Sequence, residues 1–250
     1  MPNLTRREER ILDIFREGGD TSAASLSSLL QVSVVTVRSD LRSLEAKGML
    51  VRTRGGTIPA YHPDLMEKLT SRTAEKERIA KAAADLLQDG DRVMITNGTT
   101  ASLVGRYLFG RQNMHVVTNS MLLLPYGRVN PHLHVTLVGG EFRGTADASV
   151  GPIALKQLEE FHVRIAITGT DGLTIEHGLT THLVENAEIV RKMVSQAEVK
   201  VLVTDSSKYG KVGFVKILPV SDLDIIITDR GLPGEAQADI EALGVKLILV

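Results

Sequence analysis

The sequence contains no cysteine among its 250 residues. Nothing therefore ties the chain to an oxidising compartment, to a thiolate zinc site or to a cysteine nucleophile. It also lacks a run of about 18 apolar residues, the length that a membrane-spanning helix requires. The first eight residues have no apolar core of the kind found in signal peptides. We therefore expect a soluble intracellular protein with no membrane partner.

The seven histidines do not form a metal-binding pattern. His132 and His134 are two residues apart, and His177 and His182 are five apart. Neither spacing places both imidazoles on one helix face with a carboxylate, so we expect no metal site. No Gly-x-Gly-x-x-Gly follows the first strand expected in the second part of the chain, which argues against a nucleotide-binding module. We expect no cofactor.

Positive charge is concentrated in one short segment, although the formal net charge of the chain is only -1. Residues 1–60 hold nine Lys or Arg against seven Asp or Glu, whereas residues 61–250 hold twenty against twenty-three. Within residues 34–58 the count is five against two. The length and the 43% hydrophobic content suffice for two domains, of which the first carries the basic segment.

This basic segment predicts a helix with one apolar and one polar side. Ser33 is a suitable N-cap and Gly48 a suitable stop. A front of Thr, Ser and Arg suits the major groove of DNA, although an ordinary solvated face has the same composition. Helical spacing places Val34, Val37, Leu41 and Leu44 on the apolar side and Val35, Thr36, Ser39, Arg42 and Ser43 on the polar side.

The residues around this helix predict a winged helix-turn-helix over residues 1–58. Residues 50–56 indicate a short strand and a glycine turn that carries Arg52 and Arg54, as a basic wing requires. Upstream, Thr5 and Glu8 form a capping box. Two further helices are marked by their apolar residues, Ile11, Leu12, Ile14 and Phe15 in the first and Leu26, Leu29 and Leu30 in the second.

The same residues resemble the DNA-binding head of the DeoR family of bacterial sugar-responsive repressors. Gln31 stands where that family usually has glycine, and Ser39 where a second arginine is usual, which bears on the operator sequence. We expect Thr36 and Ser39 to face bases of double-stranded operator DNA, and four arginines to meet phosphates or guanine edges: Arg38, Arg42, Arg52 and Arg54. The matching pieces are Arg7-x-x-Arg10-Ile11-Leu12, Leu26-x-x-x-Leu30-x-Val32-Ser33-x-x-Thr36-Val37-Arg38-x-Asp40-Leu41-x-x-Leu44-Glu45-x-x-Gly48 and Arg52-x-x-Gly55-Gly56.

Residues 59–72 carry Pro59 and Pro63 with no sustained period, so we expect a linker. From residue 73 to 250, short branched apolar runs alternate with helical ones, which predicts an α/β domain with a mostly parallel sheet. The fold class is thus a small, mainly α winged helix-turn-helix followed by an α/β domain. The expected strands are Val93–Thr96, His115–Thr118, Val135–Val138, Val163–Thr168, Val199–Thr204, Ile225–Thr228 and Val245–Val250.

Small polar residues follow five of these strands, where a parallel sheet binds its ligands. The sequence Asn97-Gly98-Thr99-Thr100 at a helix start suits an anion such as a phosphate. Lys208 and Arg143 supply cations. Each loop alone is more typical of a tight turn than of a binding site, but five at one edge favour a binding site. The loops are residues 96–100, 119–120, 139–143, 169–172 with 178–181, and 205–210.

These loops resemble the effector-sensing domain of the DeoR family, whose fold is similar to that of ribose-5-phosphate isomerase. The resemblance implies a phosphorylated sugar effector and a homo-oligomer, a dimer or tetramer, in the bacterial cytoplasm at the nucleoid. Thr96 stands where the family frequently has aspartate. By this likeness Gly98, Thr99, Thr100 and Lys208 hold the phosphate, Asn119 and Asp171 meet sugar hydroxyls, and Asn97, Gly140, Arg143 and Gly169 complete the site.

The alternative is an enzyme that isomerises sugar phosphates. Proton transfer between adjacent carbons needs a carboxylate, and the enediolate needs a cation. Asp171, Glu188, Arg191, Lys192 and Lys208 are candidates, although the middle three read equally well as a salt-bridged helix face. An isomerase has no use for the first sixty residues, so we expect a regulator of a sugar-catabolism operon and no catalysis.

Overall fold

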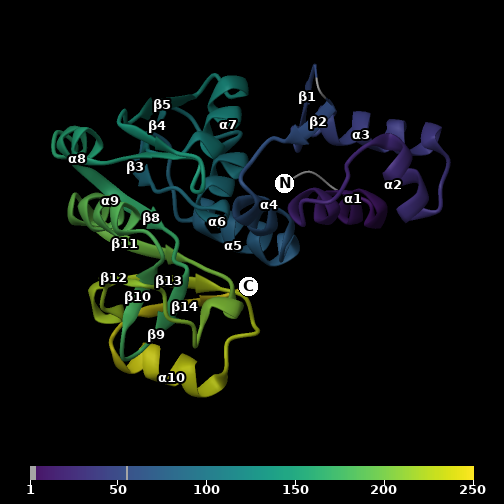
Figure 1. Ribbon diagram of the computed structural model, residues 1–250. Coiled ribbons are helices and arrows are strands. Elements are labelled where there is room, and N and C mark those ends of the chain that lie inside the picture. Colours follow the sequence, from purple (N-terminus) through teal and green to yellow (C-terminus); the bar gives the residue numbers. More distant parts are fainter. Residues whose placement is uncertain (1–3, 55) are drawn as a thin grey trace. The chain divides into compact units, whose positions relative to one another are not determined.

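The computed structural model describes residues 4–54 and 56–250 and falls into two compact units (Figure 1). The N-terminal unit ends at Ser71, and the C-terminal unit begins at Arg72. Gly55, which belongs to the expected wing turn, lies outside the described residues, as do the first three residues of the chain.

The N-terminal unit contains the predicted helices and wing. The N-cap Thr5 accepts a hydrogen bond from the amide of Glu8 (3.2 Å), and the Glu8 carboxylate accepts one from the amide of Thr5 (2.6 Å), which confirms the capping box. The hairpin of β1 and β2 is antiparallel, with Leu50 opposite Pro59. The elements are α1 (Arg6–Arg16), α2 (Ala23–Leu30), α3 (Val34–Ala46), β1 (Leu50–Thr53), β2 (Gly56–Pro59) and α4 (Pro63–Thr70).

The core of this unit forms where α1, α2, α3 and β1 meet. Ile11, Leu26, Val37 and Leu44 are fully buried, and burial of such side chains stabilises a small unit by roughly 1.5–3 kcal/mol each. Leu29, which the sequence placed among the apolar residues of α2, is instead 64% exposed. Helix α2 is therefore anchored mainly through Leu26.

The segment expected to be an irregular linker contains a helix, so that expectation is wrong. Pro63 occupies the first turn of α4, where its missing amide is harmless and its fixed φ favours the helix. Leu65 and Met66 are buried, and Met66 joins the core of the N-terminal unit. Two apolar residues within one turn do not establish a period, and the core that Met66 joins is formed largely by residues distant in the sequence, those of α1 among them, so sequence pattern alone did not reveal this helix.

The C-terminal unit is built on a seven-stranded sheet in the order β14-β13-β11-β8-β3-β4-β5. Each neighbouring pair is parallel. All seven strands coincide with predicted runs, so the parallel α/β fold is confirmed. They are β3 (Arg92–Ile95), β4 (Met114–Thr118), β5 (Leu133–Leu137), β8 (Val163–Thr168), β11 (Ala197–Val203), β13 (Ile225–Thr228) and β14 (Lys246–Leu249).

Helices cover both faces of this sheet. Ala166 and Leu202 join one core with residues of α8, α9 and α10, and the alternate residues Ile165 and Ile167 are equally buried on the opposite face. Helix α5 packs against β11 and β13. The helices are α5 (Thr73–Asp85), α6 (Thr99–Leu103), α7 (Leu124–Val129), α8 (Pro152–Leu158), α9 (Val184–Ser195) and α10 (Gly234–Ala242), with 3₁₀ turns η1 (Val104–Leu108), η2 (Met121–Leu123), η3 (Ser206–Lys208) and η4 (Val220–Asp222).

Five short antiparallel strands occupy segments that were expected to be loops or were not identified. Gly178 has a φ of +70°, and a Cβ there would lie 2.3 Å from the carbonyl oxygen of Leu218, so only glycine lets β10 approach β12. Strands of three or four residues are too short to carry a clear period-2 signal. The strands form the hairpin β6 (Glu141–Arg143) with β7 (Ala148–Val150), and the sheet β12 (Val215–Leu218), β10 (Gly178–Thr181) and β9 (Gly172–Thr174).

Candidate functional site

One side of α3 is open to solvent in the N-terminal unit. Arg38, Ser39 and Arg42 are exposed there, and Val35 is 72% exposed one turn before them. Their spacing of three, four and seven residues from Val35 puts all four on one helix face. The predicted outward orientation of Ser39 and Arg42 is what the structure shows, and Arg38 shares that side.

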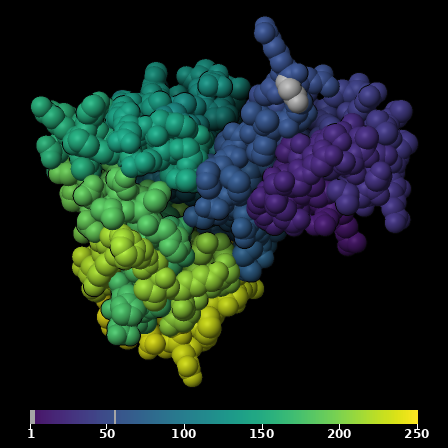
Figure 2. Space-filling view, in the orientation of Figure 1, coloured from purple at the N-terminus to yellow at the C-terminus, as the bar shows by residue number. Residues whose placement is uncertain are grey.

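A groove of about 500 Å³ separates α3 from the hairpin and brings the four predicted arginines together. None of the four forms an ion pair with a described residue, and no described residue lining the groove carries a carboxylate. The hairpin projects from the body of the N-terminal unit (Figure 2). The lining residues are Thr21, Ser22, Ala23, Arg38, Leu41, Arg42, Arg52, Thr53, Arg54, Gly56 and Thr57.

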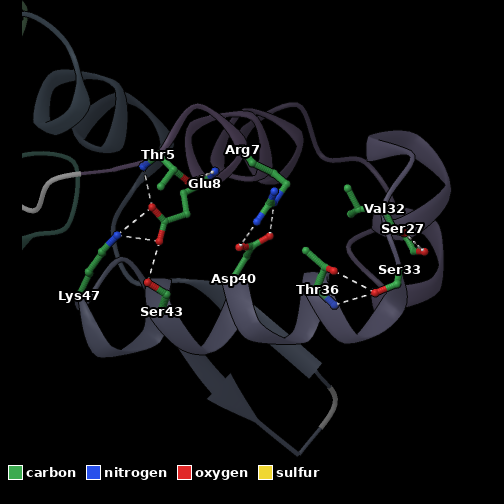
Figure 3. A network of polar contacts seen from close by, with 10 residues as sticks. All are labelled: Thr5, Arg7, Glu8, Ser27, Val32, Ser33, Thr36, Asp40, Ser43 and Lys47. Atoms are coloured by element: carbon green, nitrogen blue, oxygen red, sulfur yellow. Dashed lines mark hydrogen bonds and ion pairs between the residues drawn. The ribbon is translucent and has the colours of Figure 1, made fainter.

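Thr36, which was predicted to face bases, does not lie on this exposed side of α3. Its backbone amide and hydroxyl both contact the Oγ of the N-cap Ser33, at 3.1 and 2.9 Å. Figure 3 shows Thr36 on the same side of α3 as Asp40, Ser43 and Lys47, facing α1. The expected outward position of Ser43 is also wrong, because its hydroxyl donates to Glu8.

Two polar contacts fasten α3 to α1, and sequence analysis did not identify either (Figure 3). The guanidinium of Arg7 donates to both oxygens of Asp40, at 2.5 and 2.9 Å. The carboxylate of Glu8 accepts from Ser43 Oγ at 2.7 Å and from Lys47 Nζ at 2.6 and 2.7 Å. In the sequence, these contacts are indicated by a second polar stripe on α3. Its members recur at intervals of four, three and four residues and are Thr36, Asp40, Ser43 and Lys47.

The contacts of Arg7 with Asp40 and of Glu8 with Ser43 and Lys47 form a clamp between α1 and α3. The pKa of Glu8 depends on this clamp. Burial by itself raises the pKa of Glu8, but hydrogen bonds from Lys47, from Thr5 and from Ser43 outweigh burial and lower it to about 2. The side chain of Glu8 is only 3% exposed. A buried carboxylate that is fully paired in this way fixes the orientation of α3 beneath the groove.

The turn between α2 and α3 is held by backbone and side chain together. Ser27 Oγ donates to the carbonyl of Val32 at 2.6 Å, and the amide of Val32 donates back to the carbonyl of Ser27 at 3.2 Å. Gln31 between them has a φ of +53°, in the left-handed region that favours glycine. This is the position at which the family usually has glycine, so Gln31 keeps the turn at some cost in strain.

In the C-terminal unit the five predicted loops leave five neighbouring strands at one edge. Because β11, β8, β3, β4 and β5 are adjacent and parallel, their carboxyl ends lie in a row. Thr96 after β3 contacts the hydroxyl of Thr168 at the end of β8, at 3.3 Å. The amide of Asn97 donates to Asn119 after β4, at 2.9 Å.

The residues after β3 and β4 are mostly buried. Asn119 is fully buried, and its side-chain amide donates to Asn97 Oδ1 and to the carbonyl of Ser149. Gly98 has a φ of +134° and precedes α6, which is only five residues long. The side chains of Thr99 and Thr100 are also buried. The side chain of Asn119 therefore links the loop that follows β3 to the loop that follows β4.

The other predicted residues occupy the same edge. Gly169 directly follows β8, and Lys208 is half-buried at the end of η3. Gly140 lies so close to the carbonyl of Val150 (2.5 Å from a Cβ) that no larger residue fits. Asp171 accepts a hydrogen bond from Thr181 at 2.7 Å.

Arg143 is paired with a carboxylate of its own unit. Its guanidinium donates to Glu185 on α9 and lies 3.7 Å from Glu141. The pKa of Glu185 is lowered by a backbone hydrogen bond and by this contact with Arg143. A ligand at Arg143 therefore competes with Glu185.

Two further features of this edge escaped sequence analysis. Asn186 on α9 donates to Thr181 at 3.3 Å, and its buried Oδ1 has no partner among the described residues. Arg72 contacts Asp205 at 3.1 Å and Asp229 at 3.2 Å, two buried carboxylates that follow β11 and β13. Neither residue belongs to a recognisable local pattern.

The candidate catalytic residues on α9 have structural contacts. Arg191 donates to the carbonyls of Ile217 and Lys216 on β12, at 3.0 and 2.7 Å, and Lys192 pairs with Glu159 at 2.9 Å. In the part of the chain that the structure describes, no group of side chains is suited to hold a metal ion. Among the same residues, no helix is both long and apolar enough to cross a membrane.

Comparisons with known proteins agree with this architecture. Residues 7–60 match the DeoR-like helix-turn-helix domain, and residues 71–230 match the DeoR C terminal sensor domain. The chain is 32% identical over 98% of its length to a putative aga operon transcriptional repressor of Escherichia coli O157:H7, covering 94% of that protein. It is 33% identical over 97% of its length to the transcriptional repressor GlcR of Bacillus subtilis strain 168, covering 96% of it.

Among solved structures, a ribose 5-phosphate isomerase A of Methanocaldococcus jannaschii is similar over 54% of this chain and 53% of its own, with 21% identity and a TM-score of 0.39. The fold assignment rests on the sheet topology, not on that similarity. The relatives named above are transcriptional repressors, and both family models are those of a regulator, so the chain is not an enzyme. The chain belongs to the DeoR family of DNA-binding transcriptional regulators.

Proposed function

We propose that this protein represses a bacterial sugar-catabolism operon, acting in the cytoplasm at the nucleoid. Operator DNA binds at α3 and the hairpin, and a phosphorylated sugar binds at the carboxyl edge of the sheet and controls that binding. The observation that carries the proposal is the groove in which Arg38, Arg42, Arg52 and Arg54 converge. Two relatives with full-length similarity are named repressors, one of them of the aga operon.

The groove suits a duplex for electrostatic and steric reasons. Exposed guanidiniums that form no ion pair with a described carboxylate are the groups that neutralise phosphates and read guanine edges. The outward face of α3 is composed of short or flexible side chains, so its backbone can approach base edges. Arg54 lies in the turn of the hairpin, where it reaches a phosphate or a minor groove beside the recognition helix.

Fluorescence anisotropy against salt concentration tests the DNA surface. The probe is a duplex recovered by in vitro selection with the whole chain. Arg54→Ala should weaken binding to all duplexes and reduce the salt slope by about one unit, because one phosphate contact is lost. Arg10→Ala, an exposed arginine on α1, is the matched control. An unchanged slope for Arg54→Ala would show that this arginine does not contact phosphate.

The effector proposal rests on the row of loops at the sheet edge. Lys208, Arg143 and the residues 97–100 bring cations, amides and hydroxyls to neighbouring strand ends, which is where α/β sheets bind ligands. The unpartnered Oδ1 of Asn186 supplies an acceptor for a ligand hydroxyl. Asp171 supplies a carboxylate at the same edge, while Thr96 supplies a hydroxyl at the position where, by the family resemblance, aspartate is frequent.

A thermal-shift screen of sugar phosphates and their unphosphorylated parents tests this site. A ligand at about 100 times its Kd should stabilise the chain by roughly 2.7 kcal/mol, a shift of several degrees. Lys208→Ala should erase the shift. Lys246→Ala is the matched control, because Lys246 begins β14 at the opposite edge of the sheet. A response to parent sugars alone would contradict the phosphate assignment.

Repression also requires more than one copy of the chain. One N-terminal unit offers little contact area, and DeoR-type recognition of repeated half-sites needs two. We therefore propose a dimer or tetramer. Light scattering at operator-binding concentrations should give a mass of at least two chains, and a monomer would contradict this part of the proposal.

A further inference from the structure

Val35 is the apolar member of the outward face of α3 and lies at the N-terminal end of that face. It is 72% exposed at the second position of α3, on the side that carries Arg38, Ser39 and Arg42. Single exposed apolar residues are common on protein surfaces, so exposure alone does not distinguish it. Its place does, because the N-terminal residues of a recognition helix are those that reach base edges.

The first turn of α3 presents no other outward side chain for this purpose. The hydroxyls of Ser33 and Thr36 contact each other at 2.9 Å, and Ser33 also caps the amide of Thr36. Val34 is half-buried, and Thr36 faces α1. Whatever lies opposite this turn in a major groove therefore meets the two methyl groups of Val35.

The major groove offers one apolar group, the C5 methyl of thymine. The hydrogen-bond donors and acceptors exposed there lose a water partner without gain when valine covers them, and cytosine presents only a hydrogen where thymine has its methyl group. Valine has no polar atom with which to replace that water. The chemistry of the side chain thus selects one of the four bases at one position.

We propose that Val35 contacts a thymine methyl in each operator half-site and thereby sets base preference, beside arginines that supply general affinity. This inference rests on the proposed DNA surface and refines it. It also places the base-reading role that the sequence suggested for Thr36 on the neighbouring residue.

A methyl-deletion experiment with the full chain tests the inference. The probe is the duplex selected in vitro, in which each thymidine is replaced in turn by deoxyuridine, which removes only the C5 methyl. We expect one position per half-site at which the replacement weakens binding about fourfold, the factor that burial of one methyl-sized group gives. In Val35→Ala the same replacement should have almost no effect. Leu29→Ala, which truncates another exposed apolar residue of the helix-turn-helix, should retain the full effect.

The results separate the inference from the surface on which it rests. If no deoxyuridine weakens binding to the unchanged chain, or if the fourfold effect survives in Val35→Ala, the thymine assignment is wrong. If Arg42→Ala binds every duplex as tightly as the unchanged chain, the proposed surface itself is wrong. Weakened binding by Arg42→Ala together with an unaltered methyl effect in Val35→Ala overturns only the role of Val35.

Discussion

Replacement of Glu8 by glutamine tests whether the clamp between α1 and α3 holds the recognition helix. The carboxylate accepts hydrogen bonds from Thr5 at 2.6 Å, from Ser43 at 2.7 Å and from Lys47 at 2.6 and 2.7 Å. Glutamine keeps the shape, but it removes the charge and turns an NH₂ group toward donors. The pKa of Glu8 falls from 4.5 to about 2 in the folded chain, which favours the ionised form by ~3 kcal/mol. We expect Glu8→Gln to lower the free energy of unfolding of the N-terminal unit by about that amount.

The pH dependence of this loss has a definite sign. Because the pKa of Glu8 is lower in the folded than in the unfolded chain, the carboxylate contributes its full stabilisation above pH 4.5. That stabilisation is lost as the pH falls from 4.5 toward about 2. The difference in unfolding free energy between the unchanged chain and Glu8→Gln should therefore shrink over this range.

Hydrogen exchange followed by mass spectrometry measures this effect locally, on peptides from α1 and α3. Glu9→Gln is the matched control, because Glu9 is an exposed neighbour on the same helix. Opening of α3 should become roughly a hundredfold more frequent in Glu8→Gln and remain unchanged in the control. Equal exchange in the two variants near neutral pH, or a difference that does not shrink with acid, would refute the reasoning.

Three further substitutions test strain and pairing. Gln31→Gly should stabilise the N-terminal unit by about 1 kcal/mol in urea unfolding, because it relieves a left-handed φ in the α2–α3 turn. Gly178→Ala should destabilise the C-terminal unit by more than ~1 kcal/mol in thermal unfolding, because a Cβ would lie 2.3 Å from the carbonyl of Leu218. Arg72→Ala should lower the free energy of unfolding by about 1–3 kcal/mol in the same assay, because buried acceptors, including the carboxylate of Asp229, lose their guanidinium partner.

Matched variants separate these causes. Gln31→Ala keeps the left-handed strain and should give no stabilisation. Gly90→Ala has a similar positive φ but no atom near its Cβ, so it should cost clearly less than Gly178→Ala. Arg78→Ala removes an exposed arginine from the same helix region and should be near neutral. Equal losses for Arg78→Ala and Arg72→Ala would refute the importance of the pairing with Asp229.

What the sequence determined by itself was the local and periodic part of this protein. The Thr5 and Glu8 capping box, the helical stripe through Val37 and Leu44, and all seven strands of the parallel sheet were predictable. The reason is that each is encoded within a few consecutive residues, by side-chain period or by a cap. The family resemblance has the same origin, because it depends on ordered spacing along the chain.

Only the tertiary structure decided which polar groups meet. The partners of Arg7 and Glu8 lie 33 to 39 residues away, so helix packing, not sequence period, fixes which side of α3 they hold. That packing turned Thr36 inward and left Val35 outward, although both lie on the polar side by spacing alone. The short antiparallel strands likewise exist because their partners provide the hydrogen bonds. The exposure of a side chain depends on contacts with residues that are far away in the sequence, and the local sequence pattern does not identify those residues.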